Sequence, residues 1–238
     1  MESFSTIDIF DTKGIEYLFI IGYLFLLIAF WRFAIKPVRI TSQIKKVIGI
    51  LTESVLQIPQ GLFYSKNHTW THMEPSGVAN VGLDDLLHHI TGDIKFHKLI
   101  EPGGEIHKGE LLTEIYHQGK MLKISAPISG QIIQVNPLLN DNQLIGSEDT
   151  YGKFWVYKIK PNNWIAETSS YYFADDATTW INKELSRFKD FLAKSIPKHS
   201  PQTSLFALQD GGELRDNTLS ELPDGVWTDF QQDFLNDI

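Results

Sequence analysis

The pattern of apolar and polar positions singles out one long apolar run near the N-terminus. Tyr17–Trp31, YLFIIGYLFLLIAFW, contains no charged residue. At about 1.5 Å per residue, residues 15–35 are just long enough to cross a hydrocarbon core of roughly 30 Å. A buried core helix seldom lacks a polar face so completely, and the acidic flank before the run is unlike the basic start of a signal peptide. We therefore expect a single transmembrane helix at 15–35, after a short extracytoplasmic N-terminus at 1–14.

Basic residues follow this run and predict its orientation. They are Arg32, Lys36, Arg39, Lys45 and Lys46. Because positive charge favours the cytoplasmic side, we expect the N-terminus outside and the rest of the chain in the cytoplasm. The span contains neither His nor Met that could ligate a haem, so we interpret it as an anchor and not as a redox helix.

The segment at 36–61 has the pattern of an amphipathic connector. Ile44, Val47, Ile48, Leu51 and Val55 recur at helical spacing, which predicts a helix lying on the membrane or against the following domain. The residues Pro59-Gln60-Gly61 end the pattern.

The pattern then changes to short alternating runs separated by turns that contain glycine, from Phe63 to Pro161. This is typical of a small all-β sandwich or barrel, with one predicted helix at Leu83–Ile90. Within it, Leu111–Gly130 reads as a hairpin whose turn is His117-Gln118-Gly119-Lys120. On its second strand the residues of one face are Leu122, Ile124 and Ala126, and those of the other are Met121, Lys123 and Ser125.

Helical spacing returns in the C-terminal part. An amphipathic helix is predicted within Trp164–Leu192, and the C-terminal helical segment is assigned to residues 166–196. Pro197 and Pro201 are expected to end it. Its apolar stripe comprises Ile181, Leu185, Phe188 and Leu192. An acidic tail follows at 197–238, with a turn at Asp210-Gly211-Gly212.

A last short helix in this tail carries Trp227, Phe230 and Phe234 on one face. Two interpretations stay open for these aromatic side chains. They pack on their own domain, or they form a face that docks to a partner protein.

Composition narrows the chemistry. The absence of cysteine excludes disulfides, cysteine-ligated clusters and a thiol nucleophile. The net charge of −8 argues against nucleic-acid binding, and most of it comes from the tail, where eight acidic residues meet two basic ones between Lys198 and Ile238. The histidines do not have metal-ligand spacing and are interpreted as scattered exposed residues; they are His88, His89, His97, His107 and His117. No motif of an independent active site occurs, so we expect a protein that is not an enzyme.

Several motifs occur in collinear order across residues 62–165. They are Asn67-His68-Thr69-Trp70, Val81-Gly82 with Gly92-Asp93-Ile94, the turn and strand at Pro102–Leu111, Ala126-Pro127-Ile128-Ser129-Gly130, Val135-Asn136, and Asp149–Trp155 with Lys158–Pro161. The segment resembles the H protein of the glycine cleavage system, a lipoyl-carrying member of the biotinyl/lipoyl-domain superfamily. The resemblance implies a mainly β fold, a lipoyl-type β-sandwich of the barrel-sandwich hybrid kind with flanking helices.

The resemblance also implies a site for lipoate at the hairpin tip. In the family, lipoate is attached to a lysine eight residues before the proline of the A-P motif, and that position is Gly119 here. Lys120 stands one residue later, and Tyr116 occupies the place of the family's glutamate. Either Lys120 carries lipoate through a shifted turn, or it is a solvated turn lysine and the domain has no cofactor; the changed spacing favours the second interpretation.

Two functions therefore compete. The first is a non-catalytic, membrane-anchored subunit without lipoate that docks to or scaffolds other protein subunits of a larger membrane complex, with an electron-transfer complex as the expected host. The second is a carrier with lipoate on Lys120 that shuttles reducing equivalents or acyl or aminomethyl groups at the membrane, as in glycine cleavage. Neither involves nucleic acid or a small-molecule substrate of the protein's own.

Overall fold

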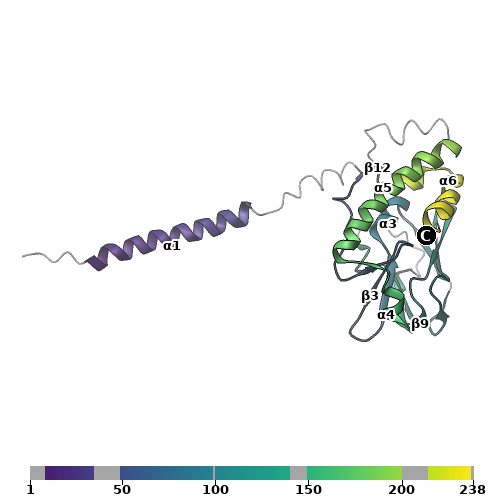
Figure 1. Ribbon diagram of the computed structural model, residues 1–238, viewed down its shortest axis with the longest axis horizontal. Coiled ribbons are helices and arrows are strands. Elements are labelled where there is room, and N and C mark those ends of the chain that lie inside the picture. Colours follow the sequence, from purple (N-terminus) through teal and green to yellow (C-terminus); the bar gives the residue numbers. More distant parts are fainter. Residues whose placement is uncertain (1–8, 35–48, 99, 140–148, 200–213, 237–238) are drawn as a thin grey trace, which may run out of the picture. The chain divides into compact units, whose positions relative to one another are not determined.

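The computed structural model describes residues 9–34, 49–98, 100–139, 149–199 and 214–236 (Figure 1). The chain forms two compact units, Met1–Gln43 and Ile44–Ile238. All of the β-structure belongs to the second unit as far as the described ranges show.

The first unit contains one helix, α1, at Ile9–Ala34. Large apolar side chains between Tyr17 and Phe30 are exposed on it. Within the described ranges, no helix combines the length and the apolar character that crossing a membrane requires. The transmembrane span at 15–35 and its orientation therefore stay predictions.

The connector is only partly described, and its described part is not helical. Gly49 adopts a positive φ of 70°, and β1 (Ile50–Leu51) follows directly. This strand pairs antiparallel with β12 (Leu214–Arg215), and Leu51 is buried. The predicted amphipathic helix is wrong from Gly49 onward, because pairing with a distant strand overrides the local period of 3.6; the earlier part of the connector lies outside the described residues.

Two antiparallel sheets form the β-sandwich, which confirms the mainly β fold with flanking helices. The first has the order β11-β2-β3-β4-β10-β9-β6 and the second the order β5-β7-β8. The strands of the first sheet are β11 (Tyr172–Phe173), β2 (Phe63–Tyr64), β3 (Thr69–Met73), β4 (Ala79–Leu83), β10 (Trp155–Pro161), β9 (Gly130–Val135) and β6 (Glu105–Ile106). Those of the second are β5 (Lys95–Lys98), β7 (Leu111–His117) and β8 (Lys120–Ser125).

The helices of the second unit depart from the prediction mainly in their limits. The predicted helix at Leu83–Ile90 is α3, Asp85–Thr91, whose first turn is capped because Asp84 accepts a hydrogen bond from the Leu87 N–H at 2.8 Å. The predicted helix at Trp164–Leu192 is two helices, α4 (Trp164–Thr168) and α5 (Ala174–His199), separated by β11.

The apolar stripe on α5 is buried as predicted. However, α5 continues through Pro197 to His199, so this proline does not end it. A proline so close to a helix C-terminus removes a single hydrogen bond, which the packed helix tolerates. Pro201 lies outside the described residues.

The tail continues with β12, then η3 (Thr218–Glu221), α6 (Asp224–Asp229) and η4 (Phe230–Leu235), the last a π-helical turn; the predicted turn at Asp210-Gly211-Gly212 lies outside the described residues. A short 3-10 turn, η1 (Pro137–Leu139), follows β9. Figure 1 shows α5 and α6 side by side at one end of the second unit, with α4 and β9 at the opposite end.

Apolar side chains gather in two cores. The first, which we call the sheet core, lies between the β-strands and comprises Ala79, Val81, Ile106, Leu112, Ala126, Ile128, Ile132, Val135, Val156, Tyr157 and Ile159. The second, which we call the helical core, combines residues of α3, α5, the hairpin β7–β8 and the C-terminal segment. The β7–β8 hairpin spans both, because Leu112 belongs to the sheet core whereas Ile115 and Leu122 belong to the helical core.

Candidate functional site at the hairpin tip

The turn between β7 and β8 has two residues, Gln118 and Gly119. His117 pairs with Lys120 across it, and both turn residues have positive φ, 48° and 88°. These are the conformations of a type I′ turn, which fits the right-handed twist of a hairpin and favours glycine. A Cβ added at Gly119 would meet nothing within 4 Å. Gly119 is therefore at the open apex, and Lys120 is already the first residue of the second strand.

Lys120 is held by the C-terminal segment of its own chain. Its Nζ donates hydrogen bonds to the backbone carbonyls of Ser220 at 3.0 Å and Leu222 at 2.5 Å. The same nitrogen lies 5.6 Å from the centre of the Trp227 ring, within the range of a cation–π contact. The interpretation of Lys120 as a solvated turn lysine is therefore wrong, because its ammonium group is half-buried and bonded.

His117, on the other side of the turn, also contacts the C-terminal segment. Its ring stacks on Trp227 with centroids 6.0 Å apart, and its Nδ1 lies 2.6 Å from the carbonyl oxygen of Asp93. The Trp227 indole N–H in turn donates to the Leu219 carbonyl at 2.7 Å. The last residue of β7 and the first residue of β8 thus both contact the C-terminal segment.

The three aromatic residues of the tail are buried inside the protein. Trp227, Phe230 and Phe234 are 2%, 0% and 1% exposed. Phe230 and Phe234 stack at 4.8 Å and pack edge-on against Phe188 of α5. The hypothesis that these residues form an exposed face for docking a partner is wrong, because their apolar stripe is covered by the stripe of α5.

A buried histidine connects the β-domain to α5 and to the tail. The His68 Nδ1 lies 2.7 Å from the Asp84 carboxylate, and its Nε2 lies 3.5 Å from the Glu184 carboxylate. Its ring stacks between Trp180 and Phe234, both at 5.4 Å. Burial alone would lower the pKa of His68, but the two carboxylates raise it to about 9, so the imidazole is charged at neutral pH.

Arg187 completes this cluster from the other side of Glu184. Its guanidinium contacts the Glu184 carboxylate at 2.6 Å and donates to the Phe234 carbonyl at 3.0 Å. Its carbon Cζ also lies 3.8 Å from the centre of the Phe234 ring. These bonds fix the end of η4 against α5, and no feature of the sequence pattern indicated them.

The two adjacent histidines of α3 differ in their hydrogen-bond partners and in their pKa values. The His89 Nδ1 lies 2.7 Å from the Asp216 carboxylate, and although burial opposes it, Asp216 and Asp85 raise the pKa of His89 to about 9. His88 is buried with no hydrogen-bond partner for either ring nitrogen in the described part of the chain, and burial lowers its pKa to about 4.

The interpretation of the histidines as scattered exposed residues is thus wrong for three of the five. His88, His89 and His117 are buried, whereas His97 and His107 are exposed. Helix packing and partner carboxylates from distant segments, which a local pattern does not reveal, bury them. Among the described residues, no group of three or more His, Asp or Glu side chains is arranged to hold a metal ion.

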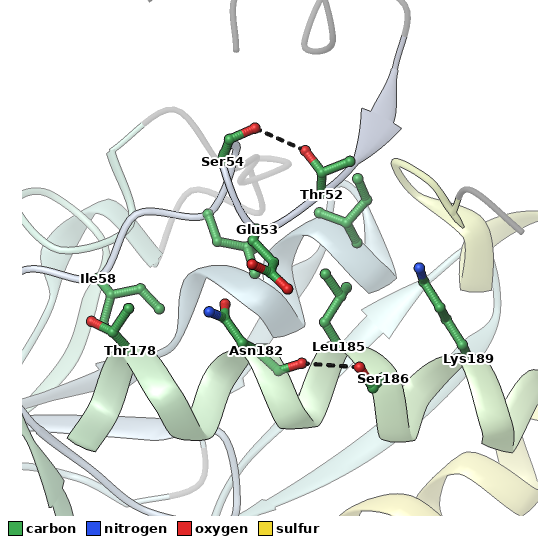
Figure 2. Close-up of a pocket in the computed structure, with 11 residues that line it drawn as sticks. Thr52, Glu53, Ser54, Ile58, Thr178, Asn182, Leu185, Ser186 and Lys189 are labelled. Atoms are coloured by element: carbon green, nitrogen blue, oxygen red, sulfur yellow. Dashed lines mark hydrogen bonds between the residues drawn. The ribbon is translucent and has the colours of Figure 1, made fainter. Parts of the chain in front are cut away.

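A separate groove of about 760 Å³ lies between the residues after β1 and α5 (Figure 2). Figure 2 shows Thr52, Glu53 and Ser54 across from the face of α5 that carries Asn182 and Lys189. Thr52 and Ser54 bond each other at 3.0 Å, and the Ser186 hydroxyl bonds the Asn182 carbonyl. Neither of these bonds joins a hydroxyl group to Glu53 or Lys189, so the contacts described for the groove give no nucleophile paired with a base.

The fold and the tip together define a β-sandwich domain of the lipoyl/biotinyl type with an exposed hairpin apex. Residues 62–184 match the sequence model of the family described as "Glycine cleavage H-protein". The chain belongs to this family. Its members are lipoyl carrier proteins and are not catalysts themselves.

Two relatives agree with this assignment by sequence. A "Probable glycine cleavage system H protein" of Pyrococcus abyssi is 39% identical over 107 residues, which cover 45% of this chain and 79% of the relative. The glycine cleavage system H protein of Geobacillus kaustophilus is 31% identical over 128 residues, 54% of this chain and 99% of the relative. The crystal structure of the H protein from Mycobacterium marinum is similar with a TM-score of 0.46 and 26% identity, covering 52% of this chain and 98% of that chain.

The family match ends within α5. The groups that hold Lys120, the ring that stacks on His117 and the nearer of the two carboxylates that pair with His89 all lie between Asp216 and Trp227, beyond the matched residues. The residues that flank the hairpin turn, His117 and Lys120, are therefore covered by a segment that the family match does not include.

Proposed function

We propose that this protein is a non-catalytic H-protein-like subunit that functions without lipoate and docks to or scaffolds a larger membrane complex. The observation that carries the proposal is the state of the hairpin tip. Glycine occupies the apex, and the neighbouring lysine donates two hydrogen bonds to carbonyls of its own chain. Gly119 offers no amine, so Lys120 is the group that lipoate attachment would have to use.

Attachment of lipoate to Lys120 would undo its present contacts. An acylated lysine is neutral and keeps one N–H donor in place of three, so at least one of the two carbonyls would lose its partner. The cation–π contact with Trp227 would also be lost, and the arm would have to pass between β8 and the C-terminal segment. These losses oppose lipoylation of Lys120. The position of Lys120, one residue after the place of the family's lysine, opposes it as well.

The proposal also includes a membrane anchor and a host complex. The uncharged run Tyr17–Trp31 and the basic residues that follow it support an anchor at 15–35, with the N-terminus outside and the domain in the cytoplasm. A domain derived from a carrier has a surface suited to docking against oxidoreductases. On that analogy the host is a membrane-bound electron-transfer complex whose other subunits are the partners.

The alternative is a carrier with lipoate on Lys120, and membership of the H-protein family favours it. In that case the tip would have to release the Ser220 and Leu222 carbonyls before a ligase or a partner enzyme reached the lysine. The dithiolane of the bound arm would supply the redox or group-transfer chemistry.

Intact-mass spectrometry of the protein purified from its native membranes, with peptide mapping across Leu111–Pro127, separates the two functions. We expect an unmodified peptide from cells whose other lipoyl proteins are modified. A lipoyl or octanoyl increment on Lys120 would instead establish the carrier. In the same cells, Lys120→Arg should leave function intact if no lipoate is needed and abolish it if Lys120 carries the arm.

A matched control shows whether a ligase can reach the tip at all. Gly119→Lys places a lysine at the position expected from the family, where the structure leaves open space. We expect a lipoyl ligase to modify the Gly119→Lys variant at the introduced side chain and to leave the unaltered protein unmodified. Affinity purification from membranes tests the docking role, and a protein that always returns alone and monomeric would contradict it.

A further inference from the structure

The second strand of the hairpin is an edge strand. In the three-stranded sheet β5-β7-β8, one side of β8 pairs with β7 and the other side pairs with no strand of the described residues. The outward N–H and C=O groups of such an edge are free to pair with another extended chain unless something covers them. The edge lies directly beside the tip where a carrier would present its lipoyl arm.

A single side-chain amide occupies part of this edge. The Lys123 N–H donates to the Gln231 Oε1 at 2.7 Å, and the Gln231 Nε2 donates to the Lys123 carbonyl at 3.2 Å. Both backbone groups of one residue are thus bonded to one planar amide, which is the pair of bonds that a residue on a neighbouring strand would make. Gln231 shows what chemistry the edge accepts.

A groove of about 480 Å³ runs along the same edge, within the size range of roughly 300–1,000 Å³ that ligand sites have. Met121 and Lys123 line it from the strand, and Asp224, Trp227 and Gln231 line it from the C-terminal segment. Met121 is 39% exposed, which offers an apolar contact beside the free edge. The groove also brings a cationic side chain to one wall and a carboxylate to the other.

The wall formed by the C-terminal segment is a permanent part of the fold. Trp227 is buried, and Val226 and Phe230 on either side of it are buried in the helical core. Exposing such side chains costs about 1.5–3 kcal/mol each, so the wall does not open as a lid would. The groove is therefore preformed. An added strand would have to displace the Gln231 amide and to pass the Lys120 side chain, which bonds to the C-terminal segment.

We propose that this groove binds an extended peptide segment of a partner protein, which adds as a strand to the edge of β8 and replaces the Gln231 amide at Lys123. Charge complementarity favours a segment that carries a carboxylate for Lys123 and a basic side chain for Asp224. Backbone bonds give such a complex its affinity, and the side chains near Met121 and Trp227 give it selectivity. The proposal rests on the docking function proposed above and specifies the surface that performs it.

The test uses the full chain in detergent and a displayed library of random linear peptides of about eight residues, enough to cover the edge at roughly 3.3 Å per residue. Selected peptides are then measured against three variants. Lys123→Pro removes the outward N–H but no bond to β7, and we expect it to weaken binding at least about tenfold. The matched Lys123→Ala keeps the N–H and should bind within about threefold of the unaltered protein.

Gln231→Ala should change the peptide affinity in the opposite direction. It removes the internal competitor and should tighten binding by about two- to fivefold, a gain that mere damage to the fold would not produce. Peptides that bind Lys123→Pro as well as they bind Lys123→Ala, or that bind Gln231→Ala more weakly, would overturn the proposal. So would a library that yields no binder, or a Gln231→Ala protein that sediments as a dimer because the edge takes a second copy.

These outcomes are independent of the lipoate question. Lipoate on Lys120 of the native protein would overturn the proposed function, whereas the peptide measurements use the unmodified chain and would stand. Failure of the peptide measurements would exclude only this docking surface. It would not change the mass-spectrometry result for Lys120.

Discussion

The two cores of the second unit differ in where their residues come from. The sheet core is built from residues between Ala79 and Ile159, all inside the part that matches the H-protein family. The helical core adds Leu51 from before that part and Trp227, Phe230 and Phe234 from after it. The β-sandwich of a carrier is therefore retained at one end, and its hairpin end has been built into a larger core.

This difference matters because a hairpin that presents a mobile arm and a hairpin that packs into a core need different tips. A carrier needs a tip that projects freely so that a flexible arm can visit other proteins. Here Ile115, Leu122 and Ile124 of the hairpin contribute to the same core as the C-terminal aromatic residues, and Lys120 is bonded to that segment. Lys120 is therefore part of a fixed surface, while Gly119 at the apex stays open.

The largest expected effect comes from shortening an aromatic side chain of the helical core. Phe230 is fully buried, so Phe230→Ala should lower the free energy of unfolding by about 3–5 kcal/mol. Denaturant unfolding measures this loss, and hydrogen exchange should show faster exchange in β8. As a control, Ile165→Ala on α4 removes a side chain that is 82% exposed and should change stability by less than about 0.5 kcal/mol.

If Phe230→Ala lowered the free energy of unfolding by less than about 1 kcal/mol, the helical core would not be the larger core described above. It would mean that the C-terminal segment rests on the domain and is not part of its core.

The next effect is a dependence of stability on pH. The pKa values of His68 and His89 are raised to about 9 by partner carboxylates, above the ordinary value of 6.5. Their stabilisation is therefore fully present below pH 6.5 and is lost as the pH rises through 9, by on the order of 3 kcal/mol for each group. Denaturant unfolding between pH 6 and 9.5 should show this decline.

Variants assign the decline to these two residues. His89→Gln should remove about half of it, because the titrating group that faces Asp216 and Asp85 is lost while His68 remains. The exposed His107 serves as the matched control, and His107→Gln should leave the profile unchanged. A flat profile in the unaltered protein would show that the carboxylates do not hold these imidazoles in the charged form.

A smaller effect is expected at the lysine of the tip. Lys120→Met keeps much of the side-chain length but removes the donors to the Ser220 and Leu222 carbonyls, at a cost of about 1–3 kcal/mol. Lys66 is exposed, and Lys66→Met should cost less than about 0.5 kcal/mol. Equal stabilities of the two variants would mean that the tip is not held by the C-terminal segment.

The smallest effect concerns the turn itself. Gly119 has a φ of 88°, so Gly119→Ala should cost about 1 kcal/mol although the added Cβ meets no atom. Gly119→Asn should cost less, because asparagine tolerates the left-handed region better. Thermal unfolding should show a shift of about 2–4 °C for the alanine variant, and an equal loss in both would point to a cause other than backbone conformation.

Much of the fold follows from local pattern. The hairpin was predictable because alternation and a glycine turn act within a few residues, and the predicted turn at His117–Lys120 is confirmed. The predicted division of this strand into two faces is confirmed as well, since Leu122 and Ile124 are buried whereas Met121 and Lys123 are exposed. The stripe on α5 is of the same kind, because the helical period reveals which face is apolar.

The site was less predictable because distant segments complete it. Nothing near Lys120 in the sequence indicates that carbonyls about a hundred residues later accept its hydrogen bonds. The same holds for His89 and Asp216, and for the pairing of Leu51 with Leu214 that replaced the predicted helix. An aromatic stripe predicts burial but does not say whether its own chain or a partner covers it.

The two-residue ladder between β1 and β12 determines how the domain would carry mechanical load. Gly49 is the first described residue of the second unit. Its carbonyl accepts a hydrogen bond from the Asp216 N–H at 2.6 Å, and the next two residues pair with Arg215 and Leu214. Tension applied at Gly49 would therefore reach β12, the strand that leads into the C-terminal segment, before it reached the sandwich. Force applied at Gly49 would pull first on the strand that directly precedes the residues holding Lys120.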